Sequence, residues 1–199
     1  MTLTHARALL TGTALLAVST LAHAQATTWK FDPPHSQAEF VIRHMGISNI
    51  NGRFGNVTGE VTLDPKDLTK ANVKAIIDTT TVDTGIAQRD THLKSADFFD
   101  VSKYPTMTFV SKSVTRNGDG YDILGDLTLH GVTKPVTLKM DEPSEEQTGM
   151  DGKLHRGFSA STNLRRQDFG LVWHGTLKSG DSVIGDDVKV ILDVEAVKE

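Results

Sequence analysis

The chain of 199 residues contains no cysteine. It therefore has no disulfide, thiolate metal site or iron–sulfur cluster, and neither a cysteine nucleophile nor a lipid-modified N-terminal cysteine. Its fold must be stabilised by a packed apolar core. A chain of this length makes one domain, or at most two small ones, and the absence of linkers and repeats favours one.

The sequence also lacks an excess of positive charge. Its 21 Lys and Arg residues are outnumbered by 25 Asp and Glu residues, which gives a formal net charge of −4. Phosphate backbones attract basic proteins, so nucleic acid is not an expected partner. With 38% hydrophobic and 23% charged residues, the composition is that of a folded globular protein.

Long apolar runs are scarce, and the clearest one lies at the N-terminus. Residues 8–21 carry no charge and precede Ala22-His23-Ala24, the small-x-small pattern that a signal peptidase recognises. The run is shorter than the ~20 residues that span a bilayer, which makes an uncleaved anchor helix the weaker alternative. We predict a signal peptide over residues 1–24, a mature chain over residues 25–199 with no transmembrane segment, and a periplasmic location.

Motifs of common catalytic and metal sites are missing too. The sequence has no G-x-S-x-G nucleophile elbow and no G-x-G-x-x-G dinucleotide fingerprint. Its eight histidines form no H-x-H or H-x-x-x-H pair, so we predict neither a metal site nor a cofactor. The scattered Asp and Glu residues leave a pair of catalytic carboxylates open as an alternative.

Alternation of apolar and polar residues dominates the rest of the chain. It recurs over six segments: 38–43, 57–63, 72–77, 121–129, 136–140 and 188–195. This pattern predicts strands with one dry and one wet face, as antiparallel sheets have. Asn117-Gly118-Asp119-Gly120 and His130-Gly131 are typical of turns between strands, and the acidic segment 141–152 predicts a loop.

Only residues 86–95 have the spacing of a helix. Short strands with one inserted helix predict an all-β barrel or sandwich, and we favour a barrel of about eight strands. Its dry faces mix large side chains with small ones, for instance Phe40 with Ala38. Small residues inside a barrel either leave room for a guest molecule or fit the taper of a solid core, and the pattern alone leaves both open.

Motifs spread over the body of the chain are similar to those of one family. They are Asp32-Pro33-Pro34-His35-Ser36, residues 40–46, Asn51-Gly52-Arg53-Phe54, residues 89–93, 97–101, 104–109, 125–136 and 166–170, and Val194-Glu195-Ala196. In this order they resemble the YceI-like family of polyisoprenoid-binding proteins. The resemblance implies an extended, lipocalin-like antiparallel β-barrel whose internal tunnel takes a polyisoprenoid or fatty-acid derivative. It also implies export, a homodimer and no enzymatic activity.

We therefore predict a periplasmic carrier or sequestering protein for a long amphiphilic lipid. Strand alternation places eight apolar side chains on the tunnel wall: Phe40, Ile42, Phe54, Ile77, Phe109, Leu127, Leu129 and Phe158. Arg89 and His92 share one face of the helix and are candidates to bind an anionic head group, with His44 behind them. Phe98 and Phe99 follow the helix and are candidates for the mouth.

Three alternatives stay open. Arg89 and Asp90 could serve only to fix the helix on the barrel through a local network. An enzyme that acts on a lipid in the same pocket is disfavoured, because no nucleophile with a neighbouring base is evident. A partner-binding module for a membrane redox protein would use the barrel merely as a scaffold.

Overall fold

The computed structural model describes residues 26–199, and the predicted signal peptide, residues 1–24, lies outside the described residues. The strands of the described part are β1 (Thr27–Phe31), β2 (Gln37–His44), β3 (Ser48–Phe54), β4 (Val57–Asp64), β5 (Asp67–Asp78), β6 (Thr106–Asn117), β7 (Gly120–Leu129), β8 (Val132–Met140), β9 (Gln147–Thr148), β10 (Leu154–Arg165) and β11 (Ile184–Lys198). The helices are α1 (Ala87–Lys94) and the short 3-10 turns η1 (Pro33–His35), η2 (Thr79–Thr81) and η3 (Arg166–Phe169). None of the helices in this part of the chain has the length and apolar character needed to cross a membrane.

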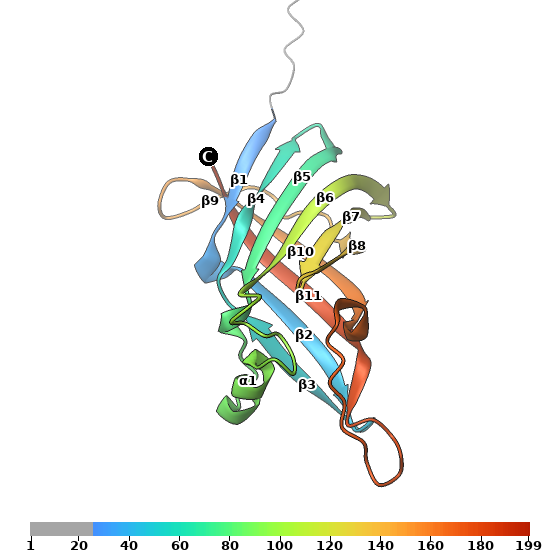
Figure 1. The fold of residues 1–199 in the computed structure, drawn as a ribbon. Coiled ribbons are helices and arrows are strands. Elements are labelled where there is room, and N and C mark those ends of the chain that lie inside the picture. The colour runs from blue at the N-terminus through green and yellow to red at the C-terminus, as the bar shows by residue number, and fades with distance from the viewer. Residues whose placement is uncertain (1–25) are drawn as a thin grey trace, which may run out of the picture.

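Eight strands close into an antiparallel barrel (Figure 1). Around the ring they follow the order β1, β4, β5, β6, β7, β8, β10 and β11, and the pairing of β11 with β1 completes it. The 15-residue β11 makes this closure because it pairs with β10 on one edge and with both β2 and β1 on the other. The predicted barrel of about eight strands with one short inserted helix is confirmed.

Strands β2 and β3 extend the wall beyond the ring. The first part of β11, from Ile184 to Asp193, pairs with β2, and β2 pairs in turn with β3. Only the last residues of β11, from Ala196 to Lys198, pair with β1. In Figure 1 the β2–β3 hairpin projects below the ring, and α1 hangs beside it from the connection between β5 and β6.

The predicted turns join neighbouring strands. Asn117 and Gly120 pair directly across the β6–β7 turn. His130 and Gly131 connect β7 to β8 with φ angles of 52° and 74°, the left-handed values that a two-residue hairpin turn of type I′ requires. The predicted loop over residues 141–152 contains no regular element except the two-residue β9. Helix α1 lies within the predicted segment 86–95.

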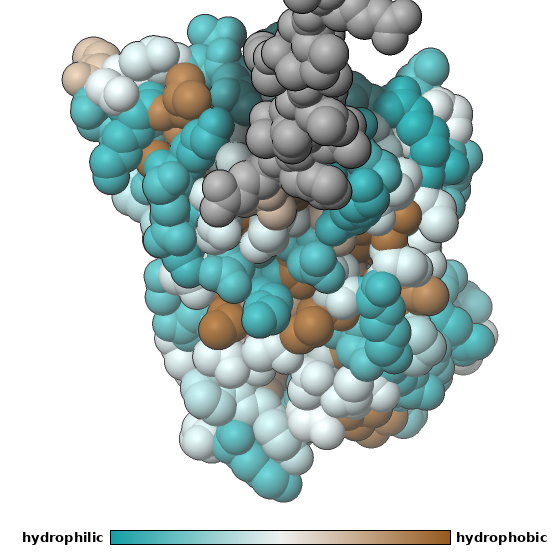
Figure 2. Space-filling view, turned by 90° about the horizontal axis from the view of Figure 1, so that it is seen from above, coloured by the Kyte–Doolittle hydropathy of each residue, from teal (hydrophilic) through white to brown (hydrophobic). Residues whose placement is uncertain are grey.

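Three groups of buried side chains follow one another along the barrel. The end formed by β1 and the last residues of β11 contains Trp29, Val61, Leu63 and Ala196. The wall formed by β6, β7 and β8 contains Phe109, Val114, Tyr121, Ile123 and Leu138. The end nearer α1 contains Ala38, Phe54, Val57, Val82, Met107, Leu129, Phe169 and Leu171. Seen from the end opposite α1, the surface is mainly hydrophilic, and hydrophobic residues form small separate patches (Figure 2).

Candidate functional site: a cavity along the barrel

An elongated cavity of about 430 Å³ lies inside the barrel. Its size falls in the range of roughly 300–1,000 Å³ that is usual for small-molecule sites. All eight strands of the ring contribute side chains to its wall, and so do β2, β3 and α1. The polar residues among those that line it are Glu39, His44, Thr84, Arg89, His92, Thr162 and Arg166. The wall is otherwise apolar, which suits a hydrocarbon guest.

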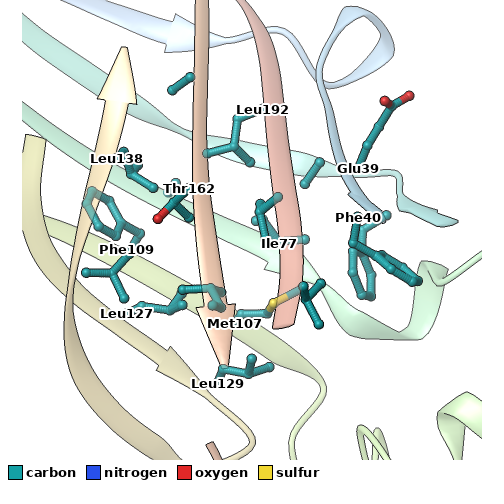
Figure 3. Close-up of a pocket in the computed structure, with 18 of the residues that line it drawn as sticks. Glu39, Phe40, Ile77, Met107, Phe109, Leu127, Leu129, Leu138, Thr162 and Leu192 are labelled. Carbon is teal, nitrogen blue, oxygen red and sulfur yellow. The ribbon is translucent and has the colours of Figure 1, made fainter. Parts of the chain in front are cut away.

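Strand alternation builds this wall, because every second residue of a strand points inward. Val73, Ala75 and Ile77 of β5 all reach the cavity. Figure 3 shows side chains from separate strands, such as Leu127 of β7 and Leu192 of β11, pointing into the same space. The small side chains on these faces border a cavity, so they do not merely fit the taper of a solid core.

Gly125 of β7 leaves room for the aromatic ring of Phe109. A Cβ atom on Gly125 would lie 2.4 Å from Cζ of Phe109 and 2.6 Å from the Val110 carbonyl oxygen. Phe109 therefore lies across bare backbone of the neighbouring strand, where a larger residue would push the ring toward the cavity.

All eight residues predicted for the wall line this cavity: Phe40, Ile42, Phe54, Ile77, Phe109, Leu127, Leu129 and Phe158. Phe54, Phe109 and Leu129 are buried, and the other five are half-buried. Their contact with a ligand stays a prediction.

The two ends of the cavity differ in chemistry. At the end away from α1, Trp29 is fully buried and packs with Leu63 and Ala196, and its indole Nε1 donates a hydrogen bond of 3.0 Å to Thr27 Oγ1. At the other end the cavity continues past the ring, where His44 of β2 and His92 of α1 belong to its lining. Thr84, Arg89 and His92 thus bring polar groups to the end that α1 borders, whereas Glu39 and Thr162 lie within β2 and β10.

Aromatic rings shape the end near α1 in two contiguous groups. Phe54 lies between Phe40 and Phe99, with ring centroids 5.6 Å and 5.3 Å away. His92, Phe98 and Trp173 form a second group, with centroid distances between 5.0 and 5.3 Å. Of the two residues predicted for the mouth, Phe99 thus packs into the wall, whereas Phe98 packs against the candidate head-group residue His92.

Trp173 is a site residue that the sequence analysis missed. It lies in the irregular segment between η3 and β11, where no alternation places it on a face. A tryptophan in a segment without regular structure was the available signal, because so large an apolar side chain needs a surface to pack on. The buried Arg166 holds this segment through hydrogen bonds to the carbonyl oxygens of Leu171 (2.5 Å) and Trp173 (2.8 Å).

Arg89 has a local role as well as a place on the cavity wall. Its Nε donates to Thr84 Oγ1 at 2.7 Å and its Nη2 donates to the Thr84 carbonyl at 2.8 Å. The Asp90 carboxylate accepts from the Thr84 amide at 2.9 Å. Both side chains thus bond Thr84, in the segment that leads into α1, and these contacts fasten the start of the helix. The alternative that the pair fixes the helix on the barrel itself stays a prediction.

Further polar contacts position α1 and its neighbours. Nε2 of His92 lies 2.9 Å from Oδ2 of Asp97. Arg53 of β3 and Asp83 pair through both backbone amides at 2.9 Å and through their side chains at 3.2 Å. A hydrogen bond from the Gly85 amide, together with the Arg53 guanidinium, holds the pKa of the Asp83 carboxyl below its ordinary value. The chain leading into α1 is thereby tied to the β2–β3 extension.

The barrel wall is weakest between β8 and β10. Among the described residues these strands pair only at Ala160 with Met140 and at Ser161 with Lys139. A surface hollow follows the rest of this seam, lined by residues 134–137 of β8 and 162–165 of β10. The side chains shared by the hollow and the cavity are Val136, Thr162, Leu164 and Phe169. A single layer of side chains thus separates the cavity from the surface here.

Comparisons with known proteins agree with this architecture. The family model described as "YceI-like domain" matches residues 29–196. A UPF0312 protein of Pseudomonas aeruginosa is 40% identical over 185 residues, which cover 92% of this chain and 93% of that protein. The YCEI protein of Campylobacter jejuni has a solved structure with a TM-score of 0.66 and 31% identity, covering 79% of this chain and 90% of that one. A polyisoprenoid binding domain from Saccharophagus degradans, at 17% identity and a TM-score of 0.60, shares the fold over 88% of this chain and 100% of its own.

Proposed function

Because this chain belongs to the YceI-like family, we propose that it binds a long-chain amphiphilic lipid, a polyisoprenoid or fatty-acid derivative, inside the barrel. The observation that carries the proposal is the apolar cavity, whose wall is formed by alternate residues of eight closed strands. The description of the Saccharophagus domain as polyisoprenoid binding agrees with this ligand class.

The energetics of chain burial favour useful affinity. Each methylene group moved from water to an apolar wall gains ~0.8 kcal/mol, so a chain of about 16 carbons gains on the order of 12 kcal/mol. Lost translation, rotation and chain freedom take back ~4 kcal/mol or more. A remainder of ~8 kcal/mol corresponds to micromolar binding.

The head group of the lipid lies, in this proposal, at the end of the cavity bordered by α1. Arg89, His92 and His44 all line the cavity, and Arg89 and His92 belong to α1 itself. Hydrogen bonds from an arginine to an anionic group are stronger than those between neutral groups. Phe98 and Trp173 pack against His92 and give the lipid chain an aromatic surface next to its polar end.

Binding without catalysis suits the composition of the cavity wall. Among the described residues that line it there is no serine and no aspartate, and its one glutamate, Glu39, points away from the apolar group in Figure 3. Its hydroxyl groups belong to Thr162 and to Thr84, whose Oγ1 accepts a hydrogen bond from Arg89 Nε. Nucleophilic catalysis needs a nucleophile with a base in hydrogen-bond reach. The family and its polyisoprenoid-binding neighbour agree with a binding protein.

Two matched variants of β7 test the lipid proposal. Leu127 lines the cavity, whereas Leu124, on the opposite face of the same strand, is 39% exposed. Leu127→Glu should empty the protein of lipid, because a carboxylate cannot share a closed apolar space with hydrocarbon, and Leu124→Glu should not. Organic extracts of purified, folded protein are analysed by mass spectrometry for a stoichiometric long-chain amphiphile. If wild-type protein carries none and binds no added fatty acid or isoprenoid, the proposal is wrong.

Carriage or sequestration in the periplasm is the setting we propose for this binding. The apolar run before Ala22-His23-Ala24 supports it. We expect the intact mass of the protein recovered from the periplasm to match a chain that begins at Gln25. A full-length chain retained with the membrane fraction would contradict this location and leave the binding proposal standing.

A further inference from the structure

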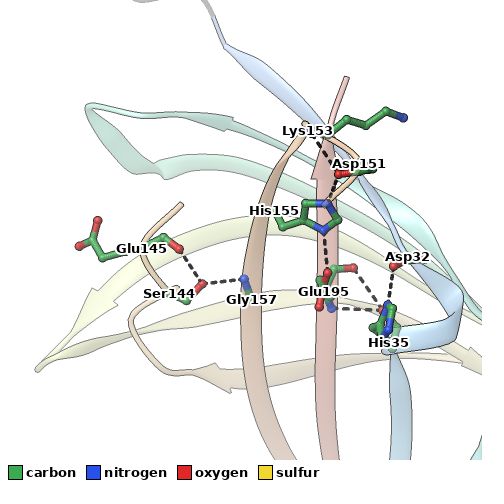
Figure 4. Close-up of polar contacts among 10 residues, drawn as sticks. Asp32, His35, Ser144, Glu145, Asp151, Lys153, His155, Gly157 and Glu195 are labelled. Carbon is green, nitrogen blue, oxygen red and sulfur yellow. Dashed lines mark hydrogen bonds and ion pairs between the residues drawn. The ribbon is translucent and has the colours of Figure 1, made fainter. Parts of the chain in front are cut away.

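The motif Asp32-Pro33-Pro34-His35-Ser36 lies outside the lipid cavity, at the corner between β1 and β2 (Figure 4). Here β11 changes its neighbour from β2 to β1. The backbone of Glu195 holds the corner: its carbonyl oxygen accepts from the Asp32 amide at 2.8 Å and from Ser36 Oγ at 3.2 Å, and its amide donates to Ser36 Oγ at 3.2 Å. These bonds fix the corner without using the Glu195 side chain.

The side chains at this corner gather nitrogen and oxygen donors in a small volume. Nδ1 of His35 lies 2.7 Å from Oδ2 of Asp32. One such atom from each of Asp32, His35 and Glu195 can be chosen so that all three lie within 4.8 Å of one another. Asp32 and Glu195 are half-buried, and the imidazole of His35 is exposed, so an ion from solvent can reach them.

We propose that Asp32, His35 and Glu195 bind a divalent transition-metal ion of the Zn²⁺ class. One imidazole nitrogen and two carboxylate oxygens are a ligand set that Zn²⁺ accepts, with water in the fourth position of a tetrahedral site. The imidazole favours such ions over Mg²⁺ and Ca²⁺, which prefer oxygen ligands alone.

A second histidine supports the arrangement from behind. Nδ1 of His155 lies 2.6 Å from Oε1 of Glu195, and its Nε2 lies 3.0 Å from Oδ1 of Asp151 (Figure 4). Partners of this kind orient metal-binding side chains, and their removal typically costs about 10–100-fold in metal affinity. His155 is thus a positioning residue in the proposal.

The metal site and the lipid cavity are independent. Val194 lines the cavity, and Glu195, the next residue of the same strand, faces the other side of the wall. The spacing of histidines along the sequence did not indicate this site, because its ligands come from the β1–β2 corner and from β11, more than 150 residues apart. A failure to bind lipid would therefore not contradict the metal site, and a failure to bind metal would not contradict the lipid site.

Calorimetric titration of the full mature chain, stripped with EDTA and dialysed, tests the proposal. We expect one Zn²⁺ ion per chain for wild-type protein, and the visible absorption of a four-coordinate ion when Co²⁺ replaces it. His35→Ala and Glu195→Gln should abolish saturable binding, His155→Gln should weaken it about tenfold or more, and excess Mg²⁺ or Ca²⁺ should not compete. The control is His174→Ala, which removes an exposed histidine from a distant loop and should leave binding unchanged.

Folding of the variants is checked by circular dichroism. Glu195→Gln keeps the backbone bonds to Asp32 and Ser36, so we expect it to fold even where His35→Ala does not. The proposal is overturned if wild-type protein shows no one-to-one binding, or if Zn²⁺ binds the folded Glu195→Gln variant as well as it binds wild type.

Discussion

Gly52 of β3 lies beneath the ring of Phe40, one of the aromatic side chains on the cavity wall. A Cβ atom at this position would lie 2.2 Å from Cζ of Phe40, and the three nearest atoms all belong to that ring. The backbone of Gly52 does not have a positive φ, so glycine is needed here for space alone. A single hydrogen atom in place of a methyl group thus lets the ring approach the backbone of β3 closely.

Gly52→Ala should therefore turn the Phe40 ring toward the cavity. We expect the free energy of unfolding to fall by about 1–3 kcal/mol, the usual cost of overpacking, and the affinity for an added fatty acid to fall as well. Urea unfolding and a fluorescent fatty-acid displacement assay measure the two effects. Gly55→Ala is the matched control, because nothing lies within 4 Å of a Cβ built on Gly55. Equal behaviour of both variants would show that Gly52 makes no room for the ring.

At the level of single residues, strand alternation was enough to predict where the wall side chains lie. Phe40 and Ile42 share a face because they are two residues apart, and both line the cavity. Trp173 could not be placed in this way, because it lies in a segment without a period. The Asp32–His35–Glu195 group was equally out of reach, because pairing between β1 and β11 brings its members together.

Among the elements, the six alternating segments each became part of a strand, namely β2, β4, β5, β7, β8 and β11. Strand β6 was missed as an alternating run. Its register with β7 shifts between Ser111 and Ser113, and such a bulge moves the apolar residues that follow to the other parity. Closure of the ring was not visible in any local pattern, because it depends on β11 pairing with strands at both ends of the sequence.

Sparse pairing between β8 and β10 leaves most of one edge of β8 without a neighbouring strand in the described part of the chain. Strand β8 pairs with β7 from Val132 to Met140, but with β10 only at Lys139 and Met140. Pro135, which has no amide hydrogen to donate, is tolerated because this edge of β8 is otherwise unpaired in the described part of the chain. In the described part of the chain, the remaining backbone groups on this edge of β8 have no partner in β10.

Hydrogen exchange should therefore be uneven around the ring. We expect peptides that cover residues 132–138 of β8 and 162–165 of β10 to exchange amide hydrogens faster than peptides from the β6–β7 hairpin, whose strands pair from Thr108 to Asn117 with a single bulge. Mass spectrometry of peptic peptides measures the difference. Equal protection in the seam and in the β6–β7 hairpin would mean that the barrel closes more completely in solution than the two pairs indicate.

At the scale of the whole molecule, part of the barrel interior is a cavity instead of packed side chains. The fully buried Trp29 and its neighbours fill one end, whereas the interior beyond them holds about 430 Å³ of space. Side chains that border empty space lose the packing contacts that a solid core would give them. A bound hydrocarbon chain supplies those contacts, so ligand and fold should stabilise one another.

Removal of the bound lipid should therefore lower the melting temperature. A ligand present at 100 times its Kd stabilises the folded state by ~2.7 kcal/mol, and each kcal/mol shifts the melting temperature of a domain this size by roughly 2–4 °C. We expect delipidated protein to melt about 5–10 °C lower than the loaded protein, by the same relations, with recovery when a fatty acid or isoprenoid is added back. Thermal unfolding followed by circular dichroism measures this shift.

Leu124→Glu should keep the shift and Leu127→Glu should lose it, because only the second charge enters the cavity. A melting temperature that stays the same after extraction and after addition would mean that the cavity does not hold lipid.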